Sequence, residues 1–424
     1  MNDRIVRLVG VNEMKEKQGI EEVCRQEVLQ RVALEEEIDD DSLYRVIDQV
    51  IREKSKTDPL TLAQREPLRR CLFDGFRRLD MLQELLEDEE ITEIMVNGHE
   101  DIFVERHGQV FRWDRAFESR QKLEDVIQQI VARVNRVVNE SSPTVDARLP
   151  DGSRVNVVLP PVSLSGPVLT IRKFASTPIT MEELVRLGSL SEEAAQVLKV
   201  LVKARYNIFI SGGTGSGKTT FLNALSQFIP AQERVITIED SAELQLLDQP
   251  DLVRLETRTG NGEVEVTIRQ LIRCSLRMNP DRIIVGEVRG EEALDMLQAM
   301  NTGHDGSLST GHANSPTDML TRLAMMVLMA AELPLAAIDS QIASAIDILV
   351  HLGKLRDGSR KVLSIMEVGS IENQKIVLRP IYEFEETGTD DAGRIQGRWR
   401  QCLDKLTASH KLALAGLTDP LRPL

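Results

Sequence analysis

The sequence predicts an α/β protein of several domains, in which the largest domain is a mostly parallel sheet with helices on both faces. Three short apolar runs after residue 190 (NIFIS, RVITIE and DRIIVG) alternate with segments of helical periodicity, which is the pattern of a buried parallel sheet. A chain of 424 residues is also too long for one core. We predict a helical unit over 1–73, an α/β domain over 74–178, the parallel-sheet domain over 179–390 and a C-terminal tail over 391–424.

Helical periodicity dominates the first 80 residues. One face of a predicted helix over 42–53 carries five apolar residues: Leu43, Val46, Ile47, Val50 and Ile51. Asp41 or Ser42 would cap this helix. From Ile91 the period changes to two, and ITEIMVNG and DIFVERHGQVFRW predict strands around an Asn-Gly turn. A helix over 120–139 and three further short strands complete a compact domain with an antiparallel sheet, and Thr177-Pro178 indicates a linker.

Composition limits the classes of partner. The chain has 52 Lys and Arg against 67 Asp and Glu, so its net charge of -15 argues against a nucleic acid as main partner. Its four cysteines are far apart and form no CxxC pair, so we expect neither a zinc site nor a redox dithiol. The N-terminus has no apolar signal segment, and the longest clean apolar run, over 323–331, is too short for a bilayer span. We therefore expect a cytoplasmic protein with at most peripheral membrane contact.

A glycine-rich phosphate loop follows the NIFIS run. GGTGSGKT fits the pattern GxxxxGK[ST], and it lies between a predicted strand and a predicted helix, as this motif requires. Glycines let backbone N–H groups converge on phosphate oxygens at a helix N-terminus, Lys218 would reach the β- and γ-phosphates, and Thr219 would give its hydroxyl to Mg²⁺. The predicted nucleotide-binding residues are Gly212, Gly213, Thr214, Gly215, Ser216, Gly217, Lys218, Thr219 and Thr220. A glycine-rich turn without a ligand is the alternative.

Acidic residues end two other predicted strands. Glu287 follows the run IIVG, which is the Walker B position, but Gly286 stands where an Asp usually holds Mg²⁺ through water. Glu287 must then polarise the attacking water, position the metal, or do both. Glu239 ends the strand ITIE, and parallel strands bring their carboxyl ends to the same edge as the phosphate loop. We expect Thr219, Glu239 and Glu287 to be the magnesium-binding residues, whereas ordinary strand-end acids are the alternative.

Histidines and arginines supply further candidates. His304 and His312 bracket the predicted strand SLST, where either could sense the γ-phosphate or have a purely structural role. Negative charge that develops on a transferred phosphoryl group is commonly stabilised by Arg. Arg148, Arg154 and Arg172 lie on strands of the preceding domain and form one candidate set. A second set, Arg269, Arg273 and Arg277, recurs every four residues on a helix, where a salt-bridge row or a subunit contact is the alternative. Arg289 is a further candidate.

Six stretches together resemble the secretion ATPases of type II and type IV secretion and of type IV pili, and specifically the CpaF-like ATPases of Tad/Flp pilus assembly. They are ITEIMVNG, DARLPDGSRVNVVLPP, ISGGTGSGKTT, ITIEDSAEL, the long stretch from LRMNPDRIIVGEVRG to STGHANSP, and the strand-rich continuation to about residue 385. The resemblance covers roughly residues 74–385. This sequence lacks the tetracysteine zinc motif of many type II members, which favours the pilus branch. Gly311 stands where many relatives carry a larger residue.

The resemblance implies a RecA-like ATPase domain, a preceding PAS-like domain that clamps ATP, and a homohexameric ring beneath an inner-membrane platform protein. It also implies that Glu239 belongs to the Asp box, that Glu287 is the catalytic glutamate and that His304 and His312 form the His box. Arg148, Arg154 and Arg172 would be the arginines brought to the phosphates. A Gly at position 286 is then expected.

The sequence leaves other functions open. A motor for pilus retraction or protein secretion is the nearest alternative. RecA-like rings also move nucleic acids, although the acidic balance and the lack of interleaved aromatic and basic residues weigh against that function. A nucleotide-gated scaffold that hydrolyses little ATP is disfavoured by Glu287, and a small-molecule kinase is disfavoured because no lid or acceptor motif is visible.

Overall fold

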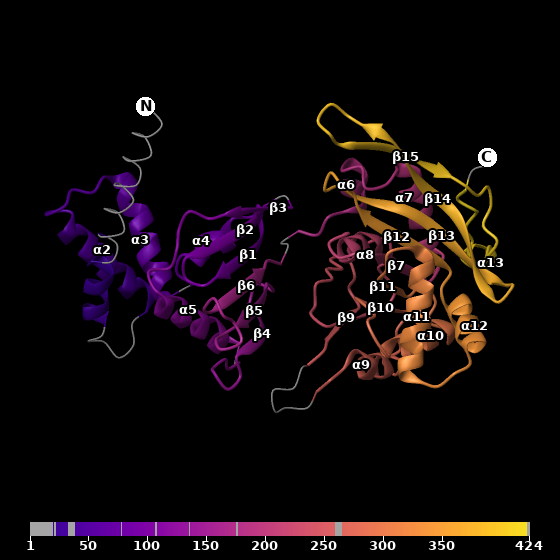
Figure 1. The fold of residues 1–424 in the computed structure, drawn as a ribbon, viewed down its shortest axis with the longest axis horizontal. Coiled ribbons are helices and arrows are strands. Elements are labelled where there is room, and N and C mark those ends of the chain that lie inside the picture. Colours follow the sequence, from indigo (N-terminus) through magenta and orange to yellow (C-terminus); the bar gives the residue numbers. More distant parts are fainter. Residues whose placement is uncertain are drawn as a thin grey trace. The chain divides into compact units, whose positions relative to one another are not determined.

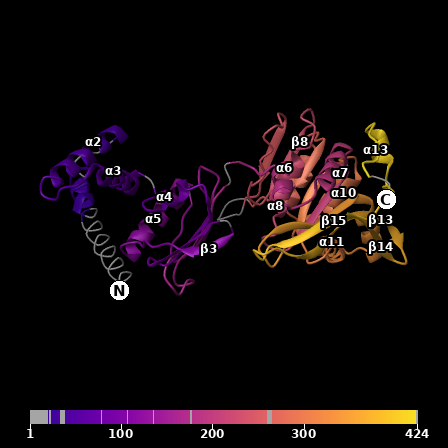
Figure 2. The same ribbon diagram turned by 90° about the horizontal axis from the view of Figure 1, so that it is seen from above.

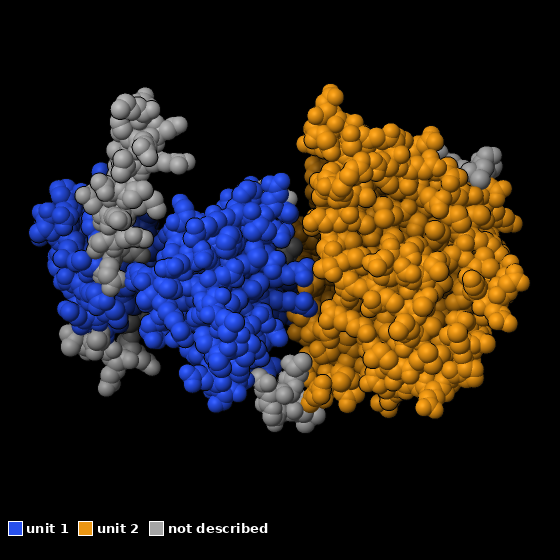
Figure 3. Space-filling view, in the orientation of Figure 1, with its two compact units in different colours: residues 1–175 blue, residues 176–424 orange. Residues whose placement is uncertain are grey.

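The computed structural model describes residue 20 and residues 23–32, 39–77, 79–106, 108–134, 136–174, 177–258 and 265–421. The chain forms two compact units, Met1–Ala175 and Ser176–Leu424, which Figure 3 shows in different colours. Their boundary falls beside the predicted linker at Thr177-Pro178. The four-part division of the chain stays a prediction.

The first unit begins with a helical part that contains α2 (Asp40–Lys54) and α3 (Leu62–Arg77). The apolar face predicted for 42–53 is buried, because Leu43, Ile47 and Val50 pack in one small core with Leu72 of α3. Helix α2 starts earlier than predicted. Its cap is Asp39, whose carboxylate accepts a hydrogen bond of 2.7 Å from the backbone N–H of Ser42.

The rest of the first unit is a six-stranded sheet in which every neighbouring pair is antiparallel, as predicted. Its strands are β1 (Ile91–Asn97), β2 (Asp101–Arg106), β3 (Gln109–Arg112), β4 (Thr144–Arg148), β5 (Arg154–Val158) and β6 (Val168–Arg172), in the order β3-β2-β1-β6-β5-β4. Helices α4 (Leu82–Glu87) and α5 (Arg120–Arg133) pack on its apolar face. Helix α5 ends before the predicted residue 139, and Val137 beyond it is exposed.

The second unit is built on a nine-stranded sheet in the order β15-β14-β13-β12-β7-β11-β10-β8-β9. Its strands are β7 (Ile208–Gly212), β8 (Val235–Glu239), β9 (Leu252–Glu256), β10 (Arg282–Val285), β11 (Leu308–His312), β12 (Ile348–Lys354), β13 (Arg360–Glu372), β14 (Lys375–Thr389) and β15 (Ile395–Gln401). The six strands from β12 to β9 are parallel, and β13, β14 and β15 extend the sheet as antiparallel strands. The predicted mixed α/β class is therefore confirmed.

Helices cover both faces of this sheet (Figures 1 and 2). The helices are α6 (Met181–Arg186), α7 (Glu192–Lys203), α8 (Lys218–Ser226), α9 (Ile268–Ser275), α10 (Glu292–Asn301), α11 (Pro316–Ala330), α12 (Leu335–Ala345) and α13 (His410–Leu414). Side chains along β7 alternate between the two faces of the sheet, so they contribute to two separate cores. Ile208 and Ile210 pack with α6, α7 and α8, whereas Phe209 points to the other face and packs with α9 to α12.

Residues predicted to form a C-terminal tail contribute to this sheet. Strand β15 pairs with β14, and its Trp399 donates a hydrogen bond of 2.7 Å to the backbone oxygen of Val362. Lys411 of α13 bonds to Asp305 at 2.6 Å and to Asp347 at 2.7 Å, which fastens the tail to the amino-terminal ends of the parallel strands. Within the described ranges no single helix has the length and apolarity of a membrane span, and α11 and α12 reach them only as a pair bent by 119°.

Candidate nucleotide site

The phosphate loop connects the carboxyl end of β7 to the amino end of α8, as its motif requires. Gly215 and Gly217 have φ angles of 69° and 90°, a backbone conformation that side chains disfavour, and Gly217 is the N-cap of α8. A Cβ atom at Gly212 would lie 2.5 Å from the backbone oxygen of Leu352 and 2.6 Å from the hydroxyl of Ser216. The tight backbone path at Gly212 therefore requires the absence of a side chain.

Lys218 is buried at the first position of α8, and its ammonium group lies inside the loop. It donates to the backbone oxygens of Gly212 and Gly213 at 3.2 Å and 3.1 Å, and it lies 3.2 Å from Nδ1 of His312. Burial lowers the pKa of Lys218, and the negative charge of Glu287 opposes that shift. The lysine thus lies where the motif predicts, with bonds to neutral acceptors that a phosphate can replace.

His312 lies between Lys218 and Glu287. An ammonium group can only donate, so Nδ1 of His312 accepts and its proton is on Nε2. Nε2 lies 2.8 Å from Oε1 of Glu287, although this contact lacks hydrogen-bond geometry. Burial, and then the positive charge of Lys218, lowers the pKa of His312. The imidazole is therefore neutral at pH 7 and connects the loop lysine to the predicted catalytic acid.

Glu287 lies just beyond β10 and is oriented by Arg289. The guanidinium of Arg289 donates to Oε2 of Glu287 at 2.7 Å and forms an ion pair with Asp240 at 3.3 Å. Hydrogen bonding to Glu287 raises the pKa of Arg289, so this cation stays charged. From the sequence, Arg289 was only a candidate for stabilising phosphate charge. In the structure it holds the carboxylate instead.

Glu239 explains why residue 286 is glycine. A Cβ atom at Gly286 would lie 2.9 Å from Cγ of Glu239, so the side chain from β8 fills the space that an Asp on β10 would need. Oε1 of Glu239 accepts from the backbone N–H groups of Glu243 and Leu244 at 2.9 Å and 3.0 Å. Its Oε2 is buried and accepts no hydrogen bond from the described residues. The neighbouring strand thus supplies the acid that β10 lacks.

Burial raises the pKa of Glu239 to about 7, against the two backbone hydrogen bonds that lower it. Below pH 4.5 the carboxyl is protonated in both the folded and the unfolded chain. Between pH 4.5 and 7 only the unfolded chain loses the proton, so the free energy of unfolding falls with pH, by up to about 3 kcal/mol for this group.

Replacing Glu239 by Gln should therefore stabilise the magnesium-free protein at pH 8 and leave it unchanged at pH 4. A Gln side chain keeps the carbonyl oxygen that accepts from Glu243 and Leu244 but has no charge to bury. Thermal unfolding in EDTA would show a midpoint several degrees higher for Glu239→Gln at pH 8. If Glu239→Gln and wild type had equal midpoints at both pH values, the raised pKa of Glu239 would be contradicted.

The structure does not bring His304 to this edge of the sheet. His304 precedes β11 and its Nδ1 lies 3.3 Å from the backbone oxygen of Ala299, whereas His312 ends the strand. A five-residue strand spans roughly 15 Å, which separates the two histidines. His304 therefore does not contact the phosphate loop of its own chain.

The two sets of candidate arginines have different surroundings in the structure. Arg269 and Arg273 on α9 both bond to Asp295 of α10, at 2.7 Å and 2.6 Å, so they form the salt-bridge row that was the alternative interpretation. In the first unit, Arg148 lies opposite Arg154 and Arg154 lies opposite Arg172 across three neighbouring strands. Residues directly opposite share a face of a sheet, so the three predicted arginines form one row.

The donors at the phosphate loop fit a magnesium ion. Mg²⁺ prefers oxygen ligands and is usually held by one or two carboxylates together with phosphate oxygens and water. Thr219 is the second residue of α8 and carries a hydroxyl, and buried oxygens of Glu239 and Glu287 accept no hydrogen bond from the described part of the chain. In those same ranges no three His, Cys, Asp or Glu side chains form a metal-binding group, so the protein alone does not enclose the ion.

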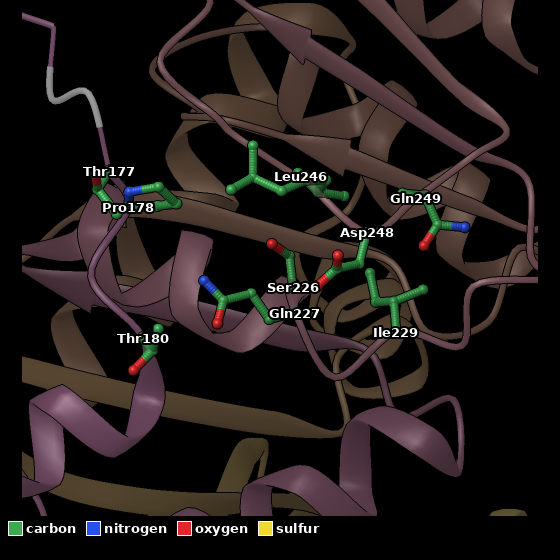
Figure 4. Close-up of a pocket in the computed structure, with 10 residues that line it drawn as sticks. Thr177, Pro178, Thr180, Ser226, Gln227, Ile229, Leu246, Asp248 and Gln249 are labelled. Carbon is green, nitrogen blue, oxygen red and sulfur yellow. The ribbon is translucent and has the colours of Figure 1, made fainter.

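A separate pocket of about 160 Å³ lies at the other end of α8 (Figure 4). Its lining includes Pro178 near the start of the second unit, Ser226 at the end of α8 and Leu246. Lys218 and Ser226 stand at opposite ends of this nine-residue helix, roughly 12 Å apart along its axis. The pocket is therefore distinct from the phosphate loop.

Together, the loop between a parallel strand and a helix, its buried lysine and the acids at the neighbouring strand ends define a P-loop nucleoside triphosphatase. A family model described as type II/IV secretion system protein matches residues 77–406. The chain belongs to this family and is an ATPase.

Individual proteins and solved structures are also similar to this chain. An uncharacterized protein of Methanocaldococcus jannaschii is 43% identical over 240 residues, which are 55% of this chain and 33% of that protein. A putative conjugal transfer protein of Mycobacterium tuberculosis is 33% identical over 323 residues, 74% of this chain and 91% of the relative. The crystal structure of the pilus retraction motor PilT with bound ADP shares the fold with a TM-score of 0.51 and 18% identity, covering 71% of this chain and 82% of PilT.

Proposed function

We propose that this ATPase is the cytoplasmic motor of a Tad/Flp-type pilus, and that it works as a homohexamer against an inner-membrane platform protein. The observation that carries a hydrolytic motor is the convergence of Lys218, His312 and Glu287 at one sheet edge. The pilus branch is supported by the matching sequence stretches and by the absence of a tetracysteine motif among four scattered cysteines. Membrane association would be peripheral, through the platform protein.

The residues divide the work of ATP hydrolysis. Lys218 would exchange its bonds to Gly212 and Gly213 for bonds to the β- and γ-phosphates. Glu287 would orient the attacking water. Neutral His312 would link Lys218, which binds the γ-phosphate, to Glu287, because its Nδ1 contacts Lys218 and its Nε2 contacts Glu287. Thr219, Glu239 and Glu287 would hold Mg²⁺, which neutralises phosphate charge when bound.

The arginine row of the first unit would complete the site when that domain closes. Arg148, Arg154 and Arg172 lie side by side on one face of that sheet, so together they would bind an anionic group such as the phosphates. Replacing Arg154, the middle member, by Gln should lower kcat by about 10- to 1,000-fold. Arg112→Gln on the edge strand β3 is the matched control, because Arg112 bonds to Asp101 at 2.6 Å. Unchanged turnover in Arg154→Gln would exclude a role of this residue at the phosphates.

A motor for secretion or conjugal transfer is the second candidate, favoured by the relative described as a putative conjugal transfer protein. In a host deleted for this chain, the pilus assignment predicts loss of surface pili with the wild-type platform protein still present. Complementation with wild type restores pili, and complementation with Glu287→Gln does not. Normal piliation in the deletion strain, together with loss of a secreted protein or of DNA transfer, would favour the second candidate.

A further inference from the structure

Arg360 reaches the phosphate loop from a part of the chain that carries no nucleotide motif. It is the first residue of β13, beyond the hairpin that leaves β12, and β12 lies beside β7 with Leu352 opposite Gly212. Nε of Arg360 donates to the backbone oxygen of Gly215 at 2.8 Å. Its Cδ lies 3.4 Å from the position of a Cβ at Gly217, so the stem of the arginine packs against the loop.

The hairpin that presents Arg360 is held by hydrogen bonds within the hairpin and by one from β15. The backbone N–H of Leu355 donates to the oxygen of Ser359 at 2.8 Å. Asp357 accepts from the backbone N–H groups of Ser359 at 3.0 Å and of Ile395 at 2.7 Å. Hydrogen bonding from Ile395 lowers the pKa of Asp357 to about 2, so this carboxylate stays charged at neutral pH. The position of Arg360 is thus set before any ligand binds.

The remaining guanidinium nitrogens of Arg360 are exposed beside the loop. In the described ranges no carboxylate lies within ion-pair distance of them. Other arginines of the antiparallel extension differ, since Arg356 pairs with Glu386, and Arg400 pairs with Glu383 and Glu385. A fixed cation without an acidic partner, next to a phosphate-binding loop, has the chemistry of a phosphate ligand.

We infer that Arg360 is a second phosphate-binding cation, which holds the phosphates shared by ATP and ADP through its two terminal nitrogens. Glu287 and His312 approach β7 from β10 and β11, whereas Arg360 approaches from β12 and β13 on the opposite side. The reacting γ-phosphate must lie toward Glu287. Arg360 therefore strengthens binding of the nucleotide before and after hydrolysis and does not act on the reacting bond. This inference rests on the nucleotide site and not on the pilus assignment.

The test compares Arg360→Gln and Arg360→Lys with the wild-type full-length chain. Arg356→Gln in the same hairpin is the matched control, because Arg356 bonds to Glu386 and not to the loop. For Arg360→Gln we expect dissociation constants for ADP and for inorganic tripolyphosphate that are about 10-fold higher or more. KM for ATP should rise by a similar factor, with kcat within about 2-fold of wild type, because the lost interaction is equal in ground and transition states.

Three outcomes would overturn the inference. Wild-type affinity in Arg360→Gln excludes a contact with the phosphates, whereas Arg360→Lys should recover part of the affinity because it keeps the positive charge. Weaker binding of ADP with unchanged binding of tripolyphosphate places the contact away from the phosphates. A large fall in kcat without a change in affinity would make Arg360 part of the chemical step. If the wild-type chain itself binds no nucleotide, the nucleotide site fails rather than Arg360 alone.

Discussion

Replacing Glu287 by Gln is expected to lower the steady-state rate of ATP hydrolysis by about 100- to 10,000-fold, because an amide cannot accept the proton of the attacking water. Binding of ATP should persist, since Lys218 and the loop backbone are unchanged and a Gln oxygen still accepts from Arg289. The measurement is kcat by phosphate release, together with the dissociation constant for ATP under conditions without turnover.

Two controls separate this effect from misfolding and from loss of binding. Glu291→Gln removes a carboxylate four residues away that pairs with Arg269, and it should keep near-normal turnover. Lys218→Ala should lose both ATP binding and turnover. Near-normal hydrolysis in Glu287→Gln would contradict the assignment of Glu287 as the residue that orients water.

Restoring the usual Walker B acid by Gly286→Asp is expected to lower both the stability and the turnover of the protein. The new Cβ would lie 2.9 Å from Cγ of Glu239, and a second carboxylate would be buried beside the first. Overpacking and an uncompensated buried charge together should cost about 2–4 kcal/mol of unfolding free energy. Turnover should also fall, because Glu239 must move from its place.

The double variant Gly286→Asp with Glu239→Gly is the matched control for this prediction. Removing the side chain of Glu239 frees the space that the introduced aspartate needs, so the double variant should be more stable than Gly286→Asp alone. A double-mutant cycle of thermal unfolding measures this coupling. Additive effects of the two substitutions would show that the two positions do not compete for one space.

The sequence was most informative where the chain alternates buried strands and helices. The runs NIFIS, RVITIE and DRIIVG match β7, β8 and β10 to within one residue at each end, because each run is short, apolar and bounded by turns or loops. The phosphate loop and Glu287 followed from their positions at strand ends. The change of period at Ile91 predicted the antiparallel sheet of the first unit, since alternation along a strand records one buried face.

Contacts between distant parts of the chain could not be predicted from sequence patterns. Arg360 contacts Gly215 from 145 residues away, and only the pairing of β12 with β7 brings it there. The space shared by Gly286 and Glu239 depends on the parallel pairing of β10 with β8. The sequence already placed His304 before and His312 after one predicted strand, and the structure shows that His312, which ends β11, is the one that contacts Lys218.

The most direct test of the motor hypothesis is ATPase activity measured across a size-exclusion profile, for wild type beside Glu287→Gln, with and without DNA. We expect activity that is confined to a peak of hexamer size, is lost in Glu287→Gln and does not change when DNA is added. Activity in the monomer peak, or strong stimulation by DNA, would contradict the proposal that a hexameric ring drives pilus assembly.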